Sequence, residues 1–93
     1  MIESIKDQTT EAVYRGQCPK GFPARIFKIA RRKLAAVDAA VTLHDLRVPP
    51  ANRLEALEGD RQGQHSRRVN DQWRICFRWT DDGPADVEIV DYH

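Results

Sequence analysis

The pattern of apolar and polar positions changes its period about halfway along the chain. In the second half, short runs with two-residue alternation predict β-strands, and Gly, Asp, Asn or Pro separates each run from the next. These runs are residues 52–57, 64–69, 73–79 and 85–93. Because the connections between them are too short for parallel crossovers, we expect the runs to form an antiparallel meander.

The run WRICFRW, residues 73–79, shows the most regular alternation. Its apolar members, which share one side of an extended chain, are Trp73, Ile75, Phe77 and Trp79. Arg74, Cys76 and Arg78 point to the other side. We therefore expect one sheet face to join the core and the other, with its two arginines, to remain available to a partner.

The first half of the chain has helical periodicity. Residues 22–40, FPARIFKIARRKLAAVDAA, are predicted to form the longest helix, with Pro23 in its first turn, where the missing N–H costs nothing. The apolar stripe, at steps of three and four residues, consists of Ile26, Ala30, Leu34 and Val37. Arg25, Lys28 and Arg32 fall on the opposite side. This helix is expected to pack with one face and to present a basic one.

Two weaker elements precede this helix. Residues 2–5 are a possible short strand, and residues 7–16 a short helix with Thr9 or Thr10 as its N-cap and Gly16 as its stop. Helices followed by antiparallel strands predict an α+β fold, in which N-terminal helices pack on one face of a small sheet.

Length and composition bound the class of protein. The 93 residues, 41% hydrophobic and 31% charged, are predicted to form one folded domain over residues 1–93. No apolar stretch reaches the roughly 18 residues that span a membrane, and the first residues lack a secretory pattern, so we expect a cytoplasmic protein. Cys18 and Cys76 lack metal-binding spacing and are interpreted as a loop thiol and a strand residue.

Charge is distributed unevenly, although the formal net charge is only +1. The segment from Arg15 to Lys33 holds seven basic residues and no acid, whereas Asp81 to His93 holds five acids and no Lys or Arg. A basic surface attracts nucleic acid or an acidic protein segment. A solvated helix face with nothing bound explains the same pattern, so charge alone leaves both interpretations open.

Several residues with suitable chemistry are expected to meet on the exposed sheet face. They are Arg74 and Arg78, Arg67 or Arg68 on the neighbouring strand, and Asp91, Tyr92 and His93 at the end of the last strand. Arginine binds phosphate through two hydrogen bonds, and imidazole exchanges protons near neutral pH. The set therefore suits phosphodiester chemistry. The alternative is that these are ordinary solvated strand residues with a loose histidine at the end.

The motifs of the second half resemble those of a known family. L-x-G-D-R-x-G at residues 57–63, W-R-I-x-F at residues 73–77 and the final D-Y-H are similar to those of HigB toxins, within the RelE-like superfamily of type II toxin–antitoxin systems. The resemblance implies an endonuclease that cuts mRNA codons in the ribosomal A site, by attack of the 2′-hydroxyl and without metal or cofactor. It also implies a HigA-like helix-turn-helix antitoxin, through which the toxin contacts operator DNA indirectly.

The resemblance also implies roles for particular residues. His93 would transfer protons, Asp91 would orient the site and Tyr92 would contact the cleaved nucleotides. Arg74 would stabilise the scissile phosphate, and Glu55 would act as a base. The basic residues expected to bind RNA are Arg67, Arg68, Arg78, Arg25, Lys28 and Arg32.

The chain departs from the family pattern in four positions, of which three change the charge or the proton-transfer chemistry. Where relatives have His-Pro-Leu-Lys-Gly-Asp, this chain has Glu-Ala-Leu-Glu-Gly-Asp at residues 55–60, so that Glu55 and Glu58 replace a histidine and a lysine. An arginine expected near the hairpin turn is Asn70. A second hypothesis is therefore a weak or inactive toxin that acts as an antitoxin-binding or ribosome-binding module, or as a co-repressor.

Overall fold

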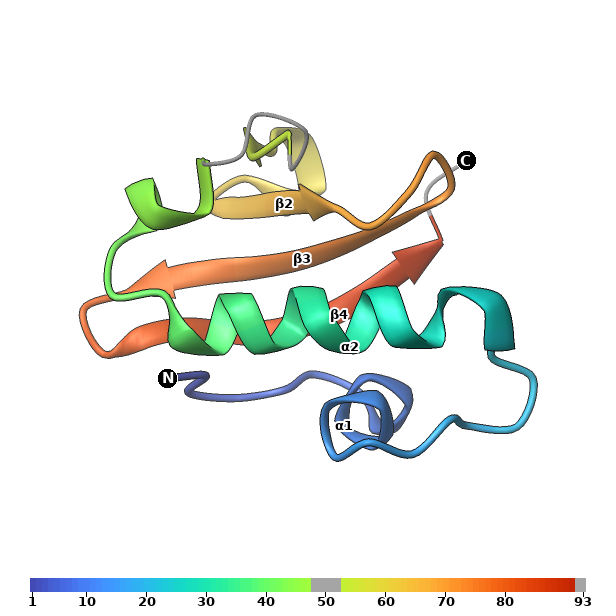
Figure 1. Cartoon of the computed structure of the whole chain (residues 1–93). Coiled ribbons are helices and arrows are strands. Elements are labelled where there is room, and N and C mark those ends of the chain that lie inside the picture. Colours follow the sequence, from blue (N-terminus) through green and yellow to red (C-terminus); the bar gives the residue numbers. More distant parts are fainter. Residues whose placement is uncertain (48–52, 92–93) are drawn as a thin grey trace.

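Two α-helices lie on one side of a four-stranded antiparallel sheet (Figure 1), so the expected α+β fold is confirmed. The computed structural model describes residues 1–47 and 53–91. The elements, including two short 3₁₀ helices, are α1 (Gln8–Tyr14), α2 (Ala24–Ala39), η1 (Leu43–Arg47), β1 (Glu55–Ala56), η3 (Gly59–Arg61), β2 (Gln64–Arg68), β3 (Trp73–Thr80) and β4 (Gly83–Asp91). No helix in these ranges is long and apolar enough to cross a membrane.

Helix α2 buries the predicted stripe, because each of its four apolar residues is 8% exposed or less. The helix begins two residues later than expected, and Pro23 is its N-cap rather than part of its first turn. Pro23 has φ −61° and ψ 116°, so its backbone is still extended. The Pro23 carbonyl accepts a hydrogen bond from the Ile26 N–H at 3.2 Å, which starts the helical pattern.

The N-cap of α1 is Asp7, and the prediction of Thr9 or Thr10 was wrong. The Asp7 carboxylate accepts from the Thr10 N–H at 3.4 Å, as capping acids do at a helix start. Thr10 has another role, because its buried Oγ1 accepts from the Ile89 N–H in β4 at 2.9 Å. The hydroxyl therefore joins α1 to the sheet. Gly16, with φ +90°, follows the helix as predicted.

The strands follow the order β1-β2-β3-β4, which confirms the meander. One row of paired residues, whose side chains share a face, is Glu55, Ser66, Cys76 and Glu88. The neighbouring row is Arg68, Arg74 and Val90. Strand β1 has only two residues, so it is shorter than the run predicted over residues 52–57.

Residues 2–6 lie along β4 instead of forming the possible strand over residues 2–5. Ile5 makes a single parallel bridge to Val87. Backbone hydrogen bonds join Glu3 to Pro84, Ser4 to Val87 and Lys6 to Val87 at 2.7 to 3.1 Å. Residue Asp86 has φ +53° and lies where the β3–β4 register shifts. The irregular backbone of β4 there explains why the pairing does not extend into a regular ladder.

The core lies between the helices and the sheet, around Phe77, Ile75, Leu34 and Val87, which are all fully buried. The opposite sheet face is less open than predicted. Cys76 points to that face and is nevertheless 0% exposed, as is Ser66 beside it. Arg74 contacts Ser66, and Arg61 reaches Glu88, the cross-strand partner of Cys76, so charged side chains lie over part of this face.

Candidate functional site

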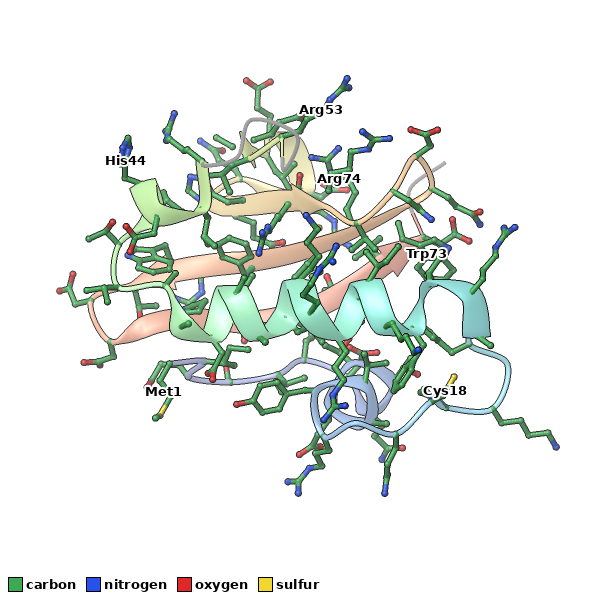
Figure 2. The ribbon with its side chains drawn as sticks, in the orientation of Figure 1. Met1, Cys18, His44, Arg53, Trp73 and Arg74 are labelled. Atoms are coloured by element: carbon green, nitrogen blue, oxygen red, sulfur yellow. The ribbon has the colours of Figure 1, made fainter. Side chains whose placement is uncertain are left out.

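Arg74 is the best-ordered candidate, because three oxygens surround its guanidinium group. Its Nε donates to Ser66 Oγ at 2.8 Å, and its Nη2 donates to the Arg53 carbonyl at 2.8 Å. The same Nη2 lies 3.8 Å from Glu55 Oε1. The Arg74 side chain is only 12% exposed. Figure 2 shows Arg53 and Arg74 near one another, beside β2 and β3.

Arg53 contributes its backbone rather than its side chain. Its φ of +47° lies in the left-handed region, which costs a non-glycine residue about 1 kcal/mol. This conformation accompanies the hydrogen bond from Arg74 to the Arg53 carbonyl. Sequence reasoning missed this partner, because nothing in the local pattern marks a carbonyl that contacts a residue 21 positions away.

Glu55 lies beside Arg74, as the hypothesis of a base requires. It belongs to β1, pairs with Ser66 and keeps a side chain that is 57% exposed. A carboxylate at this distance also competes with phosphate for the guanidinium group. Glu58 is the N-cap of η3, and its carbonyl accepts from the Arg61 N–H at 3.3 Å.

Of the two candidate arginines on β2, Arg68 shares a face with Arg74 and Arg67 does not. Arg68 and Arg74 are direct partners across the strands, and Arg68 forms an ion pair with Asp71. Arg67 pairs with Ile75 on the helix side, because neighbouring residues of a strand point to opposite faces. The expectation of an exposed RNA-binding position is therefore wrong for Arg67, which is 5% exposed.

Arg78 lies on the same face as Arg74 but outside the group around it. The two are four positions apart along the extended strand, which corresponds to about 13 Å. The Arg78 Nε donates to Asp86 Oδ2 at 3.2 Å, and both side chains are about half exposed. Arg78 thus forms a separate surface ion pair.

Strand β4 carries Asp91 to the level of Trp73, its partner across β3. Asp91 Oδ2 accepts from Gln72 Nε2 at 3.2 Å. Val90 is the direct partner of Arg74, so Asp91 lies one position beyond Arg74 and, by strand alternation, on the helix side. The expectation that Asp91 meets Arg74 on the exposed sheet face is therefore wrong. Val87 is fully buried and Ile89 packs against the core, which holds the strand that leads to Asp91. The other two members of the predicted terminal set, Tyr92 and His93, lie outside the described residues.

The basic face predicted on α2 is present, since Arg25, Lys28 and Arg32 are all exposed. Lys33 is an addition that the sequence pattern did not single out. It is half-buried at the flank of the helix, and its carbonyl accepts from Arg67 Nη1 at 3.1 Å. Burial and the charges of Arg67, Arg32 and Arg68 lower the pKa of Lys33.

His65 lies on the same side as Arg67, packed on the ring of Phe77 with 6.3 Å between ring centroids. It is half-buried rather than a surface residue of the strand, because it faces the helix layer. Burial, reinforced by the charge of Arg47, lowers the pKa of His65. His44, in η1, is exposed.

Two further side chains shape the site. Arg61 reaches across the sheet face from η3, with Nη1 2.5 Å from Glu88 Oε1 and 3.1 Å from Gln64 Oε1. Asn70 closes the β2–β3 turn, because its Oδ1 accepts from the N–H groups of Gln72 and Trp73, each at 2.8 Å. An Asn in a short turn between two strands is the signal that would have predicted this role.

Within residues 1–47 and 53–91, no three His, Cys, Asp or Glu side chains gather as metal ligands. Cys18 is exposed in the loop before α2, and Cys76 is buried in β3, where burial raises the pKa of its thiol. The arrangement around Arg74 offers a positioned guanidinium group and a nearby carboxylate. It can bind an anion and assist proton transfer.

The sequence matches known proteins over its whole length. It is 42% identical to "Toxin HigB-1" of Vibrio cholerae over 94 residues, which cover 100% of this chain and 98% of that protein. It is 29% identical to "Endoribonuclease HigB" of Proteus vulgaris over 93 residues, covering both chains completely. An uncharacterized protein of Haemophilus influenzae is 35% identical over 78 residues, 83% of this chain and 77% of that one.

A family match gives the same result. Residues 3–93 match the family described as HigB-like toxin, a RelE-like toxin of the type II toxin–antitoxin system HigB. This match confirms the resemblance inferred from the sequence motifs and agrees with the α+β arrangement of helices and sheet. The chain therefore belongs to the HigB-like family of RelE-like toxins of type II toxin–antitoxin systems.

Proposed function

We propose that this toxin is an endoribonuclease that cleaves mRNA in the ribosomal A site and thereby inhibits translation. The name of the Proteus vulgaris relative supports ribonuclease activity. The observation that carries the proposal is the ordered guanidinium group of Arg74 next to the end of β4. Because Arg74 is already held in place, it can meet developing negative charge with little reorganisation.

Cleavage proceeds by attack of the RNA 2′-hydroxyl on the adjacent phosphorus, with departure of the 5′-oxygen. Arg74 stabilises the extra charge on the phosphate oxygens. Glu55, at 3.8 Å from Arg74, is a candidate to accept the 2′-hydroxyl proton, and His93 donates a proton to the leaving oxygen. Tyr92 contacts the cleaved nucleotides, and Asp91, which points to the helix side at the end of β4, orients the site through the strand that leads to Tyr92 and His93.

The ribosome supplies substrate positioning in this proposal. An isolated chain with net charge +1 need not bind RNA tightly, because the ribosome fixes the codon in the A site. The exposed residues Arg25, Lys28 and Arg32 provide contacts to RNA. A HigA-like helix-turn-helix antitoxin binds the toxin in resting cells and connects it to operator DNA. Because the ribosome, the mRNA and the antitoxin are found in the cytoplasm, the toxin is expected to act there.

The proposal is tested by inducing the wild type and the variants Arg74→Ala and His93→Gln, and by mapping mRNA breaks in a translation reaction. The wild type should arrest growth and cleave mRNA only when ribosomes are present, whereas both variants should lose most cleavage. The far-ultraviolet circular dichroism of the purified variants checks that they fold. Undiminished cleavage by either variant would refute its assigned role.

A second candidate function is supported by the surroundings of Arg74. Two of its nitrogens already donate to Ser66 and Arg53, and Glu55 lies nearby as a competing anion. A toxin whose arginine is held in this way can serve as an antitoxin-binding co-repressor with little cleavage. Induction of the wild type separates the two functions, since a co-repressor leaves growth and mRNA intact but still shifts operator DNA together with the antitoxin.

A further inference from the structure

We propose that Arg32, Lys33 and Arg67 form a second phosphate-binding site on the helix side of β2, which takes a backbone phosphate of RNA that is not cleaved. This inference deepens the proposed function and rests on RNA as the ligand. It assigns a binding role to Lys33. Arg67 is too buried to bind RNA as an exposed strand residue, and here it is the buried floor of a site that two residues of α2 complete.

The site is built on a direct link between the helix and the sheet. Arg67 Nη1 donates to the carbonyl of Lys33 at 3.1 Å, which fixes the guanidinium group against α2. Arg67 is 5% exposed, so the link is buried. Arg32 is exposed and Lys33 half-buried on the same helix. The hydrogen bond thus holds the guanidinium group of Arg67 next to Arg32 and Lys33 of α2.

The charge of Arg67 is not explained by its contacts within the fold. Its Nε is buried and has no hydrogen-bond partner within the described residues. Burial and the charge of Arg32 lower the pKa of Arg67. A buried cation beside other cations destabilises a fold, and an apolar residue of similar volume is often better tolerated in such a position. An incoming anion would relieve this repulsion.

The neighbourhood favours phosphate as the anion. The segment from Arg15 to Lys33 contains no acid, so α2 presents uninterrupted positive charge up to this site. Guanidinium groups bind phosphate oxygens through paired hydrogen bonds, and Lys33 adds a point charge. A phosphate bound there would lie close to both Arg32 and Lys33 of α2.

The position on β2 connects the site with Arg74. Arg68 follows Arg67 directly, points to the other face and is the cross-strand partner of Arg74. Strand β1 pairs only with His65 and Ser66, so β2 is the edge of the described sheet at Arg67 and Arg68. One RNA strand that passes over this edge would meet Arg32, Lys33 and Arg67 first, Arg68 next and Arg74 last. The site therefore supplies register for the phosphate to be cleaved.

The test measures binding of a short 2′-O-methyl RNA, which cannot be cleaved by 2′-hydroxyl attack, to the purified chain at several salt concentrations. Lys33→Gln and Arg32→Gln should each weaken binding about tenfold and reduce the salt slope by about 0.7, the value for one lost phosphate contact on a single strand. Arg15→Gln is the matched control, because it removes the same charge from the C-cap of α1, where Arg15 pairs with Glu11. It should leave the slope unchanged.

Arg67→Leu separates binding from folding. If Arg67 serves RNA, this variant should bind the oligonucleotide about tenfold more weakly, while its thermal midpoint equals or exceeds that of the wild type. A lower midpoint with unchanged binding would show a purely structural arginine and overturn the proposal. Unchanged salt slopes for Lys33→Gln and Arg32→Gln would do the same.

Two other outcomes show whether the choice of RNA as the ligand or the proposed function is wrong. Tighter binding of polyglutamate than of an oligonucleotide of equal charge would assign the site to an acidic protein segment and overturn the choice of RNA. If the chain binds RNA through these residues but cleaves no mRNA on ribosomes, the proposed function fails while this site stands.

Discussion

Arg74 and Arg78 occupy the same face of the same strand, yet their surroundings differ completely. Arg74 is 12% exposed and lies among a hydroxyl, a backbone carbonyl and a carboxylate from three different segments. Arg78 is 51% exposed and has one ion pair, with Asp86. Because strand alternation places both arginines on the same face, residue spacing alone does not distinguish them. Their difference arises because Arg53 and Glu55 lie against Arg74, whereas Arg78 pairs with Asp86 of β4.

The difference shows that burial, rather than residue type, determines how firmly a charged side chain is positioned. An exposed ion pair contributes little, because water competes for both groups and the long side chains lose conformational freedom. A shielded arginine with several acceptors keeps a single orientation, which is the condition for electrostatic catalysis. Of these two arginines, Arg74 is therefore the better candidate for electrostatic catalysis.

The largest expected effect concerns cleavage. Arg74→Ala should lower the rate of mRNA cleavage on ribosomes by a factor of about 10² to 10³, the typical loss of one preorganised charge-stabilising donor. Arg78→Ala should lower it by less than about fivefold, since an exposed pair is worth up to 1 kcal/mol. Rates are compared on one mRNA by primer extension. Equal losses in the two variants would remove the distinction between the arginines.

A smaller effect is expected on stability. Ser66→Ala removes the acceptor of the Arg74 Nε from a fully buried position and should lower the free energy of unfolding by about 1 to 2 kcal/mol. Arg78→Ala should lower it by less than about 1 kcal/mol. Urea unfolding followed by tryptophan fluorescence measures both variants. Greater destabilisation by Arg78→Ala than by Ser66→Ala would contradict the proposed difference between Arg74 and Arg78.

The smallest effect concerns His65, a titrating group on the helix side of the sheet. It tests whether burial determines the behaviour of this side chain as well. The folded-state pKa of His65 is lowered below the ordinary 6.5, first by burial and then by Arg47, so protonation disfavours the folded state. Stability should therefore fall as the pH drops below about 6.5. His65→Gln removes this contribution, and its thermal midpoint should fall less between pH 7.5 and 5.5 than that of the wild type. Parallel midpoints in the two proteins would show that His65 titrates as an exposed histidine.

The local parts of the fold were predictable from the sequence. The stripe on α2, the alternation in β3 and the antiparallel meander depend on residue spacing alone, and all three are present. The cap of α1 was misassigned because Thr10 is used by β4, a contact between residues 79 positions apart. A local pattern carries no information about such a partner.

The candidate site was predictable in its residue types but not in its geometry. Sequence placed Arg74 and Glu55 in one site, and the two are within 3.8 Å. It could not separate Arg67 from Arg68, because the choice of face depends on the register between β2 and β3. Ser66 and the Arg53 carbonyl were missed, since neither has a distinctive pattern. The roles of Tyr92 and His93 stay predictions.

The hydrogen bonds between residues 2–6 and β4 also bear on when the chain can finish folding. The Asp86 N–H donates to Ser4 Oγ at 2.8 Å across 82 positions of sequence. Contacts of such long range form slowly, because nearly the whole chain must close into a loop first. During synthesis, the first residues must wait until the last strand has left the ribosome. A toxin built in this way completes its sheet only after β4 has been synthesised.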